Sequence, residues 1–249
     1  MDLGLADKVA IVTGAGRGLG RAAAEALVSE GALVLGAART SAELDELRAM
    51  APDAVETVVC DMLDLEAVAD LPRQAVERFG RLDVVVNNAG LAPAGDFLEQ
   101  GPDLWQRVFG INVFAPAALC RAAGEYLIPQ GSGKVVNIAS TSGVIGKARL
   151  VAYSSSKGAI IQQTTALAAE WARHGIQVNA IAPGAFATEA QAQVIEDADL
   201  FARRVRKIPA RRMGDPTELG PLVCLLASRH TDFVTASIFV ADGGEANTA

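Results

Sequence analysis

Residues 13–20 read Thr-Gly-Ala-Gly-Arg-Gly-Leu-Gly, and they join a short apolar run, Val9–Thr13, to a helical pattern that starts near residue 19. Glycines at such a junction let the chain turn tightly. They also let the backbone approach a pyrophosphate, which binds the free N–H groups at the positive end of the helix. Glycine triplets at a fixed spacing also arise by chance, so the place of this one between strand and helix matters more than its spacing. The segment predicts a dinucleotide-binding turn.

Short apolar runs rich in β-branched residues alternate with longer helical patterns along the whole chain. We expect strands at Val9–Thr13, Leu33–Gly36, Val55–Cys60, Asp83–Val86, Lys134–Ile138, Ile176–Ile181 and Ile238–Val240. We expect helices at about residues 19–30, 41–50, 64–79, 102–128, 152–173 and 216–228. Strands that are apolar on both faces and joined by helices form a parallel sheet with helices on each side. The pattern predicts an α/β, Rossmann-type, doubly wound sheet of about seven strands.

No linker, charge block or repeat divides the chain, so we expect one dinucleotide-binding and catalytic domain over residues 1–249. One irregular insertion, at about residues 185–212, is expected to form a lid over the substrate. Six cations lie in it: Arg203, Arg204, Arg206, Lys207, Arg211 and Arg212. They could draw in an anionic substrate. The alternative is a solvated helix face paired with Glu196, Asp197 and Asp199.

The composition excludes several classes of protein. The chain has 22 Lys+Arg against 29 Asp+Glu, a formal charge of −7, which argues against a nucleic-acid partner. No apolar stretch approaches the ~20 residues of a membrane span, so no membrane partner is expected. Cys60, Cys120 and Cys224 are odd in number and lie in apolar runs, which favours the reducing cytoplasm. His174 and His230 have no partners at ligand spacing, so no metal is expected.

The charge at the end of the second expected strand bears on the choice of dinucleotide. An acid there accepts hydrogen bonds from the adenosine ribose, whereas a 2′-phosphate needs a cation and no carboxylate. Residues 36–40 read Gly-Ala-Ala-Arg-Thr, which places Ala38 where an acid would stand and Arg39 next to it. Arg17 of the glycine loop can reach the same phosphate. NADP(H) is therefore favoured, with NAD(H) possible; otherwise Arg39 is a solvated cap and Arg17 a surface residue.

Tyr153 and Lys157 stand four residues apart near the start of a helical pattern, so both side chains project from one face. When a hydride reaches a carbonyl carbon, the oxygen becomes an alkoxide that must be protonated, and a phenol can supply the proton. In the reverse direction the phenol must act as a base. We expect the Lys157 ammonium to lower the pKa of Tyr153, because a nearby cation favours the phenolate.

A set of motifs spread over nearly the whole chain resembles the short-chain dehydrogenase/reductase family. The matching residues are Thr13–Gly20, Asp61, Asn87-Asn88-Ala89-Gly90, Asn112, Ser140, Tyr153 with Lys157, Asn179, Pro183-Gly184 with Thr188, and Asp242-Gly243-Gly244. The resemblance implies that Asn112, Ser140, Tyr153 and Lys157 are catalytic. Ser140 would orient the substrate oxygen and stabilise developing charge. Ser142, two residues further along the strand, is its rival.

The resemblance also implies a role for Asn112, which interrupts an apolar helical pattern. It would lie in a local helix distortion and bind a water that passes protons to Lys157. The alternative is a single buried structural hydrogen bond.

The resemblance assigns the cofactor site as well. The residues expected to bind the dinucleotide are Gly14, Arg17, Gly18, Leu19, Gly20, Arg39, Asp61, Met62, Asn88, Ala89, Gly90, Tyr153, Lys157, Pro183, Gly184, Phe186 and Thr188. Asp61 would contact the adenine amino group, Lys157 the nicotinamide ribose and Thr188 the nicotinamide carboxamide. Asp61 could equally be a helix cap or turn residue, and both roles are compatible.

These features predict an NADP(H)-preferring oxidoreductase that interconverts a ketone and a secondary alcohol of a small-molecule substrate. Glu170-Trp171-Ala172 and residues 179–184 resemble the sugar-acid (gluconate-type) dehydrogenases of the family, with 3-oxoacyl-carrier-protein reductases close behind. A protein of another class, a non-catalytic dinucleotide-binding sensor, would need no proton donor. By resemblance, the helices at 102–128 and 152–173 would pack in a homodimer or homotetramer, with the C-terminal strand making a second interface.

Overall fold

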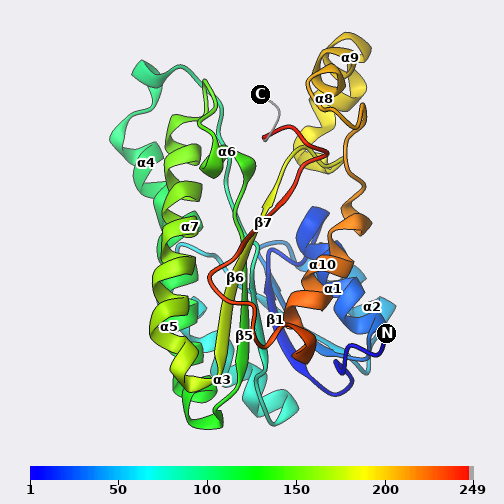
Figure 1. The fold of residues 1–249 in the computed structure, drawn as a ribbon, viewed down its shortest axis with the longest axis vertical. Coiled ribbons are helices and arrows are strands. Elements are labelled where there is room, and N and C mark those ends of the chain that lie inside the picture. The colour runs from blue at the N-terminus through cyan, green and yellow to red at the C-terminus, as the bar shows by residue number, and fades with distance from the viewer. Residues whose placement is uncertain (247–249) are drawn as a thin grey trace.

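A computed structural model describes residues 1–246 and has one seven-stranded sheet at its centre (Figure 1). All neighbouring strands pair in parallel, in the order β3-β2-β1-β4-β5-β6-β7. The strands are β1 Val9–Thr13, β2 Leu33–Ala38, β3 Val55–Val59, β4 Val84–Asn87, β5 Gly133–Ile138, β6 Ile176–Pro183 and β7 Ile238–Ala241. The expected α/β doubly wound fold is confirmed, and each expected strand is present with ends that differ by at most two residues.

Helices cover both faces of this sheet, with α3, α5 and α7 on one side and α1, α2 and α10 on the other. The helices are α1 Gly18–Ser29, α2 Ser41–Met50, α3 Leu65–Phe79, α4 Pro102–Phe109, α5 Ala115–Gln130, α6 Thr141–Val144, α7 Val151–Trp171, α8 Ala192–Glu196, α9 Ala198–Arg206 and α10 Gly220–Ala227. Within residues 1–246 no helix is both long enough and apolar enough to pass through a bilayer.

Three helical segments differ from the sequence prediction. The pattern at 102–128 is not one helix, because a π-helical turn at Gly110–Phe114 separates α4 from α5. The segment 185–212 is not irregular: it contains α8, which packs Val194, and α9, which packs Phe201 and Val205, against a small core. The segment 216–228 begins with the 3₁₀ turn Pro216–Glu218, and the α-helix follows at α10.

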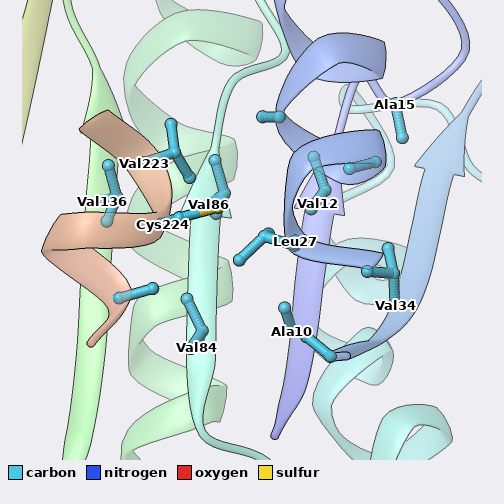
Figure 2. Close-up of a cluster of buried hydrophobic side chains, with 14 of the residues drawn as sticks. Ala10, Val12, Ala15, Leu27, Val34, Val84, Val86, Val136, Val223 and Cys224 are labelled. Atoms are coloured by element: carbon cyan, nitrogen blue, oxygen red, sulfur yellow. The ribbon is translucent and has the colours of Figure 1, made fainter. Parts of the chain in front are cut away.

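The core on one face of the sheet is built from β-branched strand residues and helix residues that meet them (Figure 2). Val12, Val86 and Val136 project from β1, β4 and β5 toward Leu27 of α1 and Val223 of α10, and all five are buried. Burying each such side chain contributes roughly 1.5–3 kcal/mol. This contact holds α1, and with it the glycine loop, against the sheet.

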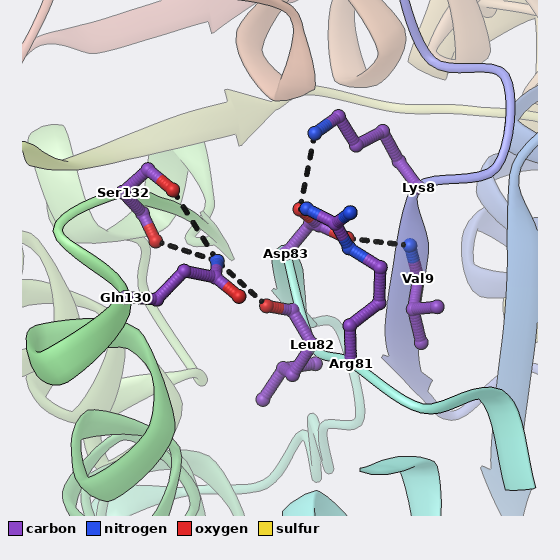
Figure 3. Close-up of polar contacts among 7 residues, drawn as sticks. All are labelled: Lys8, Val9, Arg81, Leu82, Asp83, Gln130 and Ser132. Carbon is purple, nitrogen blue, oxygen red and sulfur yellow. Dashed lines mark hydrogen bonds and ion pairs between the residues drawn. The ribbon is translucent and has the colours of Figure 1, made fainter.

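Polar contacts join the strands at the edge where β1 and β4 begin (Figure 3). Asp83 accepts hydrogen bonds from the Lys8 ammonium at 3.2 Å, from the Val9 N–H at 3.0 Å and from the Arg81 guanidinium at 2.6 and 2.7 Å. Gln130 donates to the Leu82 carbonyl at 3.0 Å. These contacts fix β1 beside β4, the place where the strand order reverses. In doubly wound sheets, ligands bind at the opposite, carboxyl ends of such strands.

Candidate active site

A cavity of about 370 Å³ opens at the carboxyl ends of the strands, between the glycine loop and the start of α7. It contains both sets of residues that the sequence analysis selected, the glycine loop and the candidate catalytic residues. Arg17 and Gly18 line it on one side, and Ser140, Tyr153 and Lys157 line it on the other. Helices α6, α8 and α9 lie at this same end of the sheet (Figure 1).

The glycine loop has the geometry of a phosphate cradle. Gly14 and Gly18 have positive φ values, +67° and +56°, which side chains rarely adopt. A Cβ atom at Gly20 would lie 2.1 Å from the Gly14 carbonyl oxygen, so α1 begins close against the loop. Arg17 occupies the N-cap of α1 with no side-chain hydrogen bond, and no acid lies in the first turn. The N–H groups at this helix end therefore suit an anion such as a pyrophosphate.

The end of β4 is joined to this loop. Asn88 donates through Nδ2 to the Thr13 carbonyl at 2.9 Å and to the Gly14 carbonyl at 3.2 Å. The Thr13 hydroxyl accepts from the N–H groups of Asn88, at 3.0 Å, and Ala89, at 3.1 Å. Asn88, Ala89 and Gly90 consequently form one wall of the cavity.

Lys157 is buried in α7 beneath the end of β5. Its Nζ donates to the Ile138 carbonyl at 2.7 Å and lies 5.9 Å from the centre of the Tyr153 ring. Ser140 follows β5 directly and caps α6, where its Oγ accepts from the Ser142 N–H at 3.1 Å. The carboxyl end of β5 therefore places the serine and anchors the lysine, while α7 carries the tyrosine.

The two titratable groups of this site are both shifted by burial. Burial lowers the pKa of Lys157 to about 8. Burial also raises the pKa of Tyr153, and the Ser140 side chain opposes this rise. The expectation that Lys157 lowers the pKa of Tyr153 is therefore wrong for this structure. The physical reason is that burial disfavours the charged phenolate, while the Lys157 ammonium donates its hydrogen bond to the Ile138 carbonyl.

Asn112 lies in the π-helical turn, so the expected helix distortion is present. Its Oδ1 accepts from the Leu91 N–H at 2.8 Å, and its Nδ2 donates to the Leu91 carbonyl at 3.0 Å and to Ser156 Oγ at 2.9 Å. These are three hydrogen bonds, not the single one of the alternative interpretation. A Cβ at Gly90 would lie 3.5 Å from both Asn112 Oδ1 and Lys157 Nζ. The glycine therefore leaves space between the amide and the ammonium.

Most of the expected site residues line the cavity. They are Gly14, Arg17, Gly18, Leu19, Arg39, Asp61, Met62, Asn88, Ala89, Gly90, Ser140, Tyr153, Lys157, Pro183, Gly184 and Thr188. Asp61 also accepts from the Leu63 N–H at 3.0 Å, so it is a turn residue as well. Gly20 supports the loop from behind, and Asn112 lies behind the cavity, hydrogen-bonded to Ser156.

Two expectations about individual residues are corrected. Phe186 does not line the cavity: it is buried against Gly214, where a Cβ would lie 2.7 Å from its ring. Ser142 is not on the strand with Ser140, because β5 ends at Ile138 and Ser142 lies in α6, outside the cavity lining. The chain turns at Ser140, so the two-residue periodicity of a strand no longer applies there.

Three residues near the site have no strong sequence signal. Ser156 is fully buried, accepts from Asn112 and donates to the Tyr153 carbonyl at 2.7 Å. Glu43 and Glu189 bring carboxylates to the cavity from α2 and from the segment after β6. Glu189 Oε2 lies 3.6 Å from the position of a Cβ at Gly18. Their placement depends on how distant segments fold together.

The cations of the 185–212 segment pair differently from the expected pattern. Arg204 forms two hydrogen bonds to the Glu245 carboxylate, at 2.7 and 2.8 Å, and Arg212 pairs with Glu218. Asp197 instead caps α9 by accepting from the N–H groups of residues 199 and 200. The Asp197 carboxylate already accepts hydrogen bonds from the free N–H groups at the start of α9. The arginines therefore pair with carboxylates further along the chain, Glu245 and Glu218.

Comparison with known proteins adds to this geometry. The family model described as enoyl-(acyl carrier protein) reductase matches residues 14–245. Galactitol 2-dehydrogenase (L-tagatose-forming) of Cereibacter sphaeroides is 37% identical, covering 94% of this chain and 93% of the relative. The 2-dehydro-3-deoxy-D-gluconate 5-dehydrogenase of Bacillus subtilis is 36% identical, with 96% and 95% covered.

A solved structure has the same fold. The gluconate 5-dehydrogenase from Burkholderia cenocepacia, in complex with NADP and tartrate, is 30% identical, with a TM-score of 0.92 and 97% and 96% of the two chains covered. The match spans nearly the whole molecule and includes the segment from the glycine loop to the C-terminal strand. With its glycine cradle and its Ser140, Tyr153 and Lys157 in one cavity, the chain belongs to the short-chain dehydrogenase/reductase family.

Proposed function

We propose that the protein interconverts a ketone and a secondary alcohol of a sugar acid, with NADP(H) as the hydride carrier. One observation carries the proposal: a proton donor, Tyr153, lines the same cavity as an anion-binding glycine loop. The named relatives act on sugar acids and a sugar alcohol, and the Burkholderia structure holds NADP. These relatives favour a sugar-acid substrate over a 3-oxoacyl carrier protein.

The cavity suits a dinucleotide along its full length. The uncapped start of α1 and Gly18 would hold the pyrophosphate, the wall Asn88–Gly90 the adenosine, and Thr188 the carboxamide of the nicotinamide. The bound dinucleotide supplies a hydride to the substrate carbon or accepts one from it.

Ser140 and Tyr153 act on the substrate oxygen. Because burial raises its pKa, the Tyr153 phenol keeps its proton at neutral pH and can donate it when the carbonyl is reduced. The Ser140 hydroxyl orients the same oxygen and stabilises its developing negative charge. Lys157, with a pKa of about 8, is mainly an ammonium at neutral pH and donates to the Ile138 carbonyl. We assign it the nicotinamide ribose as a second partner.

Asn112 is assigned to a proton path behind these residues. Its Oδ1 accepts one hydrogen bond from Leu91 and retains a second acceptor position. A water in the space beside Gly90 would contact both this oxygen and Lys157, and it would pass a proton from solvent to Lys157 after this side chain has given one up toward the Tyr153 phenol.

The test is an assay at 340 nm with sugar acids, their keto derivatives and polyols, using both NADP(H) and NAD(H). Tyr153→Phe should reduce kcat by about 10²–10⁴-fold, the typical contribution of a positioned acid–base group, while NADP⁺ binding measured by calorimetry remains. Tyr126→Phe is the matched control, because the other tyrosine lies in α5 outside the cavity. Dinucleotide binding with no turnover in any substrate class would favour the sensor. Unchanged kcat in Tyr153→Phe would contradict the mechanism.

We also propose a homo-oligomeric assembly and a reducing, cytoplasmic setting. An open hollow of about 600 Å³ lies between α5 and α7 and is lined by Ile128, Leu167 and Trp171. Beyond α10, Phe233 is fully exposed just before the edge strand β7. Both surfaces favour contact with further copies of the chain. The three cysteines are free and buried, which suits the cytoplasm.

A further inference from the structure

Glu43 brings a second carboxylate to the adenosine end of the cavity, beside the two cations, Arg17 and Arg39, that the sequence assigned to a 2′-phosphate. The residue lies in the first turn of α2, and its side chain is 29% exposed. Its Oε2 would be 2.6 Å from a Cβ at Gly16, so the side chain lies directly against the glycine loop. Its Oε1 is 3.7 Å from Arg17 Nη1. Glu43 therefore shares the cavity with Arg17 and Arg39.

The backbone of Glu43 is also held in place. Arg21 of α1 donates to the Glu43 carbonyl at 3.3 Å while its side chain pairs with Glu25. Leu44, the next residue, is buried, and Leu47 packs in the core beneath α2. The first turn of α2 is thus fixed against α1, and the carboxylate is held near the loop.

This arrangement changes the charge that a 2′-phosphate would meet. Without Glu43, Arg17 and Arg39 would present two positive charges to it. With Glu43, one of these charges is offset, because the carboxylate pairs with Arg17 and repels a phosphate. A ribose 2′-hydroxyl has no negative charge, and it can donate a hydrogen bond to a carboxylate. Glu43 therefore disfavours the binding of NADP(H) and favours the binding of NAD(H).

We propose that Glu43 is a specificity-determining residue, whose carboxylate weakens the preference for NADP(H) over NAD(H). The inference rests on the proposed function, because it requires that this cavity hold a dinucleotide. It assigns to α2 a role that the sequence assigned to the end of β2 and to Arg17 of the glycine loop. The chain should accordingly bind NADP⁺ more tightly than NAD⁺ by a modest factor only.

The test is Glu43→Gln, which removes the charge and keeps the shape of the side chain. We expect the Kd for NADP⁺, measured by titration calorimetry, to fall about five- to tenfold, the factor for unit charges about 4 Å apart in water. The Kd for NAD⁺ should stay the same or rise. The fragments 2′,5′-ADP and 5′-AMP should show the same contrast, because they differ in the 2′-phosphate. The fall in the Kd for NADP⁺ should become smaller as the salt concentration is raised, because salt screens the repulsion.

Glu46→Gln is the matched control, because Glu46 lies on α2 three residues further on, is exposed and is outside the cavity lining. It changes the net charge equally and should leave both Kd values unchanged. Arg17→Gln, made in the wild type and in Glu43→Gln, measures how strongly Glu43 and Arg17 are coupled. If Glu43 restrains Arg17, removing the arginine should weaken NADP⁺ binding more in Glu43→Gln than in the wild type.

The outcomes separate the two proposals. If the wild type binds neither dinucleotide, the proposed function fails, and the inference fails with it. If the wild type binds both, the proposed cofactor site stands. In that case the test is the ratio of the Kd for NADP⁺ to the Kd for NAD⁺. If Glu43→Gln changes this ratio less than twofold, or if Glu46→Gln changes it equally, the proposed role of Glu43 is overturned and the cofactor site is not.

Discussion

Lys157, which we assign to the reaction, lowers the stability of the fold. Its side chain is 4% exposed, and burial lowers its pKa to about 8 from a value near 10.5 in the unfolded chain. Because the unfolded state binds a proton more tightly, the unfolding free energy is reduced by about 3 kcal/mol at pH 7. That reduction fades as the pH rises from 8 to 10.5, because the folded protein loses this proton first.

Lys157→Met should therefore abolish turnover and make the protein more stable at pH 7. We expect a gain of about 1–2 kcal/mol, since the loss of the hydrogen bond to the Ile138 carbonyl offsets part of the effect. The gain should shrink when urea unfolding is repeated near pH 10. Lys134→Met is the control, because Lys134 is also buried but pairs with Asp232 at 2.6 Å. A less stable Lys157→Met variant at pH 7 would contradict this account.

At the scale of elements, the π-helical turn between α4 and α5 depends on contacts to its neighbours. Asn112 joins it to the chain after β4 through Leu91 and to α7 through Ser156, which in turn donates to the Tyr153 carbonyl. A π turn is less favourable than a continuous α-helix, so it persists where other groups hold it. These contacts place the turn beside Ser156 and Tyr153 of α7.

Ser156→Ala should loosen this turn without removing a group that touches substrate. It leaves one N–H of the buried Asn112 amide without its partner, which costs about 1–3 kcal/mol in urea unfolding. We expect kcat to fall about tenfold, because small displacements of catalytic groups are costly, while the Kd for NADP⁺ changes little. Ser155→Ala, at the exposed neighbouring position of the same helix, should change neither. Equal effects of the two variants would show that Ser156 has no special role.

The elements also show what the sequence predicts and where it stops. β1 and α2 are predicted residue for residue because a short, continuous apolar run and a helical spacing of buried leucines are local signals. The π turn is missed because an apolar pattern continues through residues 110–114, and the distortion depends on Leu91 and Ser156. Helices α8 and α9 are missed because their apolar residues are sparse and gain their burial from Ile208 and Met213. Glu43 is missed because only the folded loop shows what it contacts.

On the scale of the whole molecule, two surfaces expose apolar side chains or unpaired backbone groups that contact with another copy of the chain would cover. The first is the hollow between α5 and α7, where Gly124 lets Trp171 approach the helix and Leu167 is only partly buried. The second is the region of β7, which pairs with β6 on one side and forms an edge of the sheet on the other. Edges with unpaired N–H and C=O groups are common sites of association.

These surfaces predict an assembly that two substitutions should take apart in different ways. Phe233 is fully exposed beside β7, so Phe233→Asp should remove the second interface and halve the mass measured by light scattering. Leu167→Arg should disrupt the α5–α7 contact, since it places an unpaired charge in the centre of an apolar interface. Leu98→Asp is the control, because Leu98 is 97% exposed but lies in the turn Phe97–Glu99, which neither lines the hollow nor belongs to β7. A tetramer with two kinds of interface separates through a dimer. Phe233→Asp should leave the dimer that the α5–α7 contact holds, whereas Leu167→Arg should disrupt that dimer. If all three variants keep the mass of the wild type, neither surface is an interface.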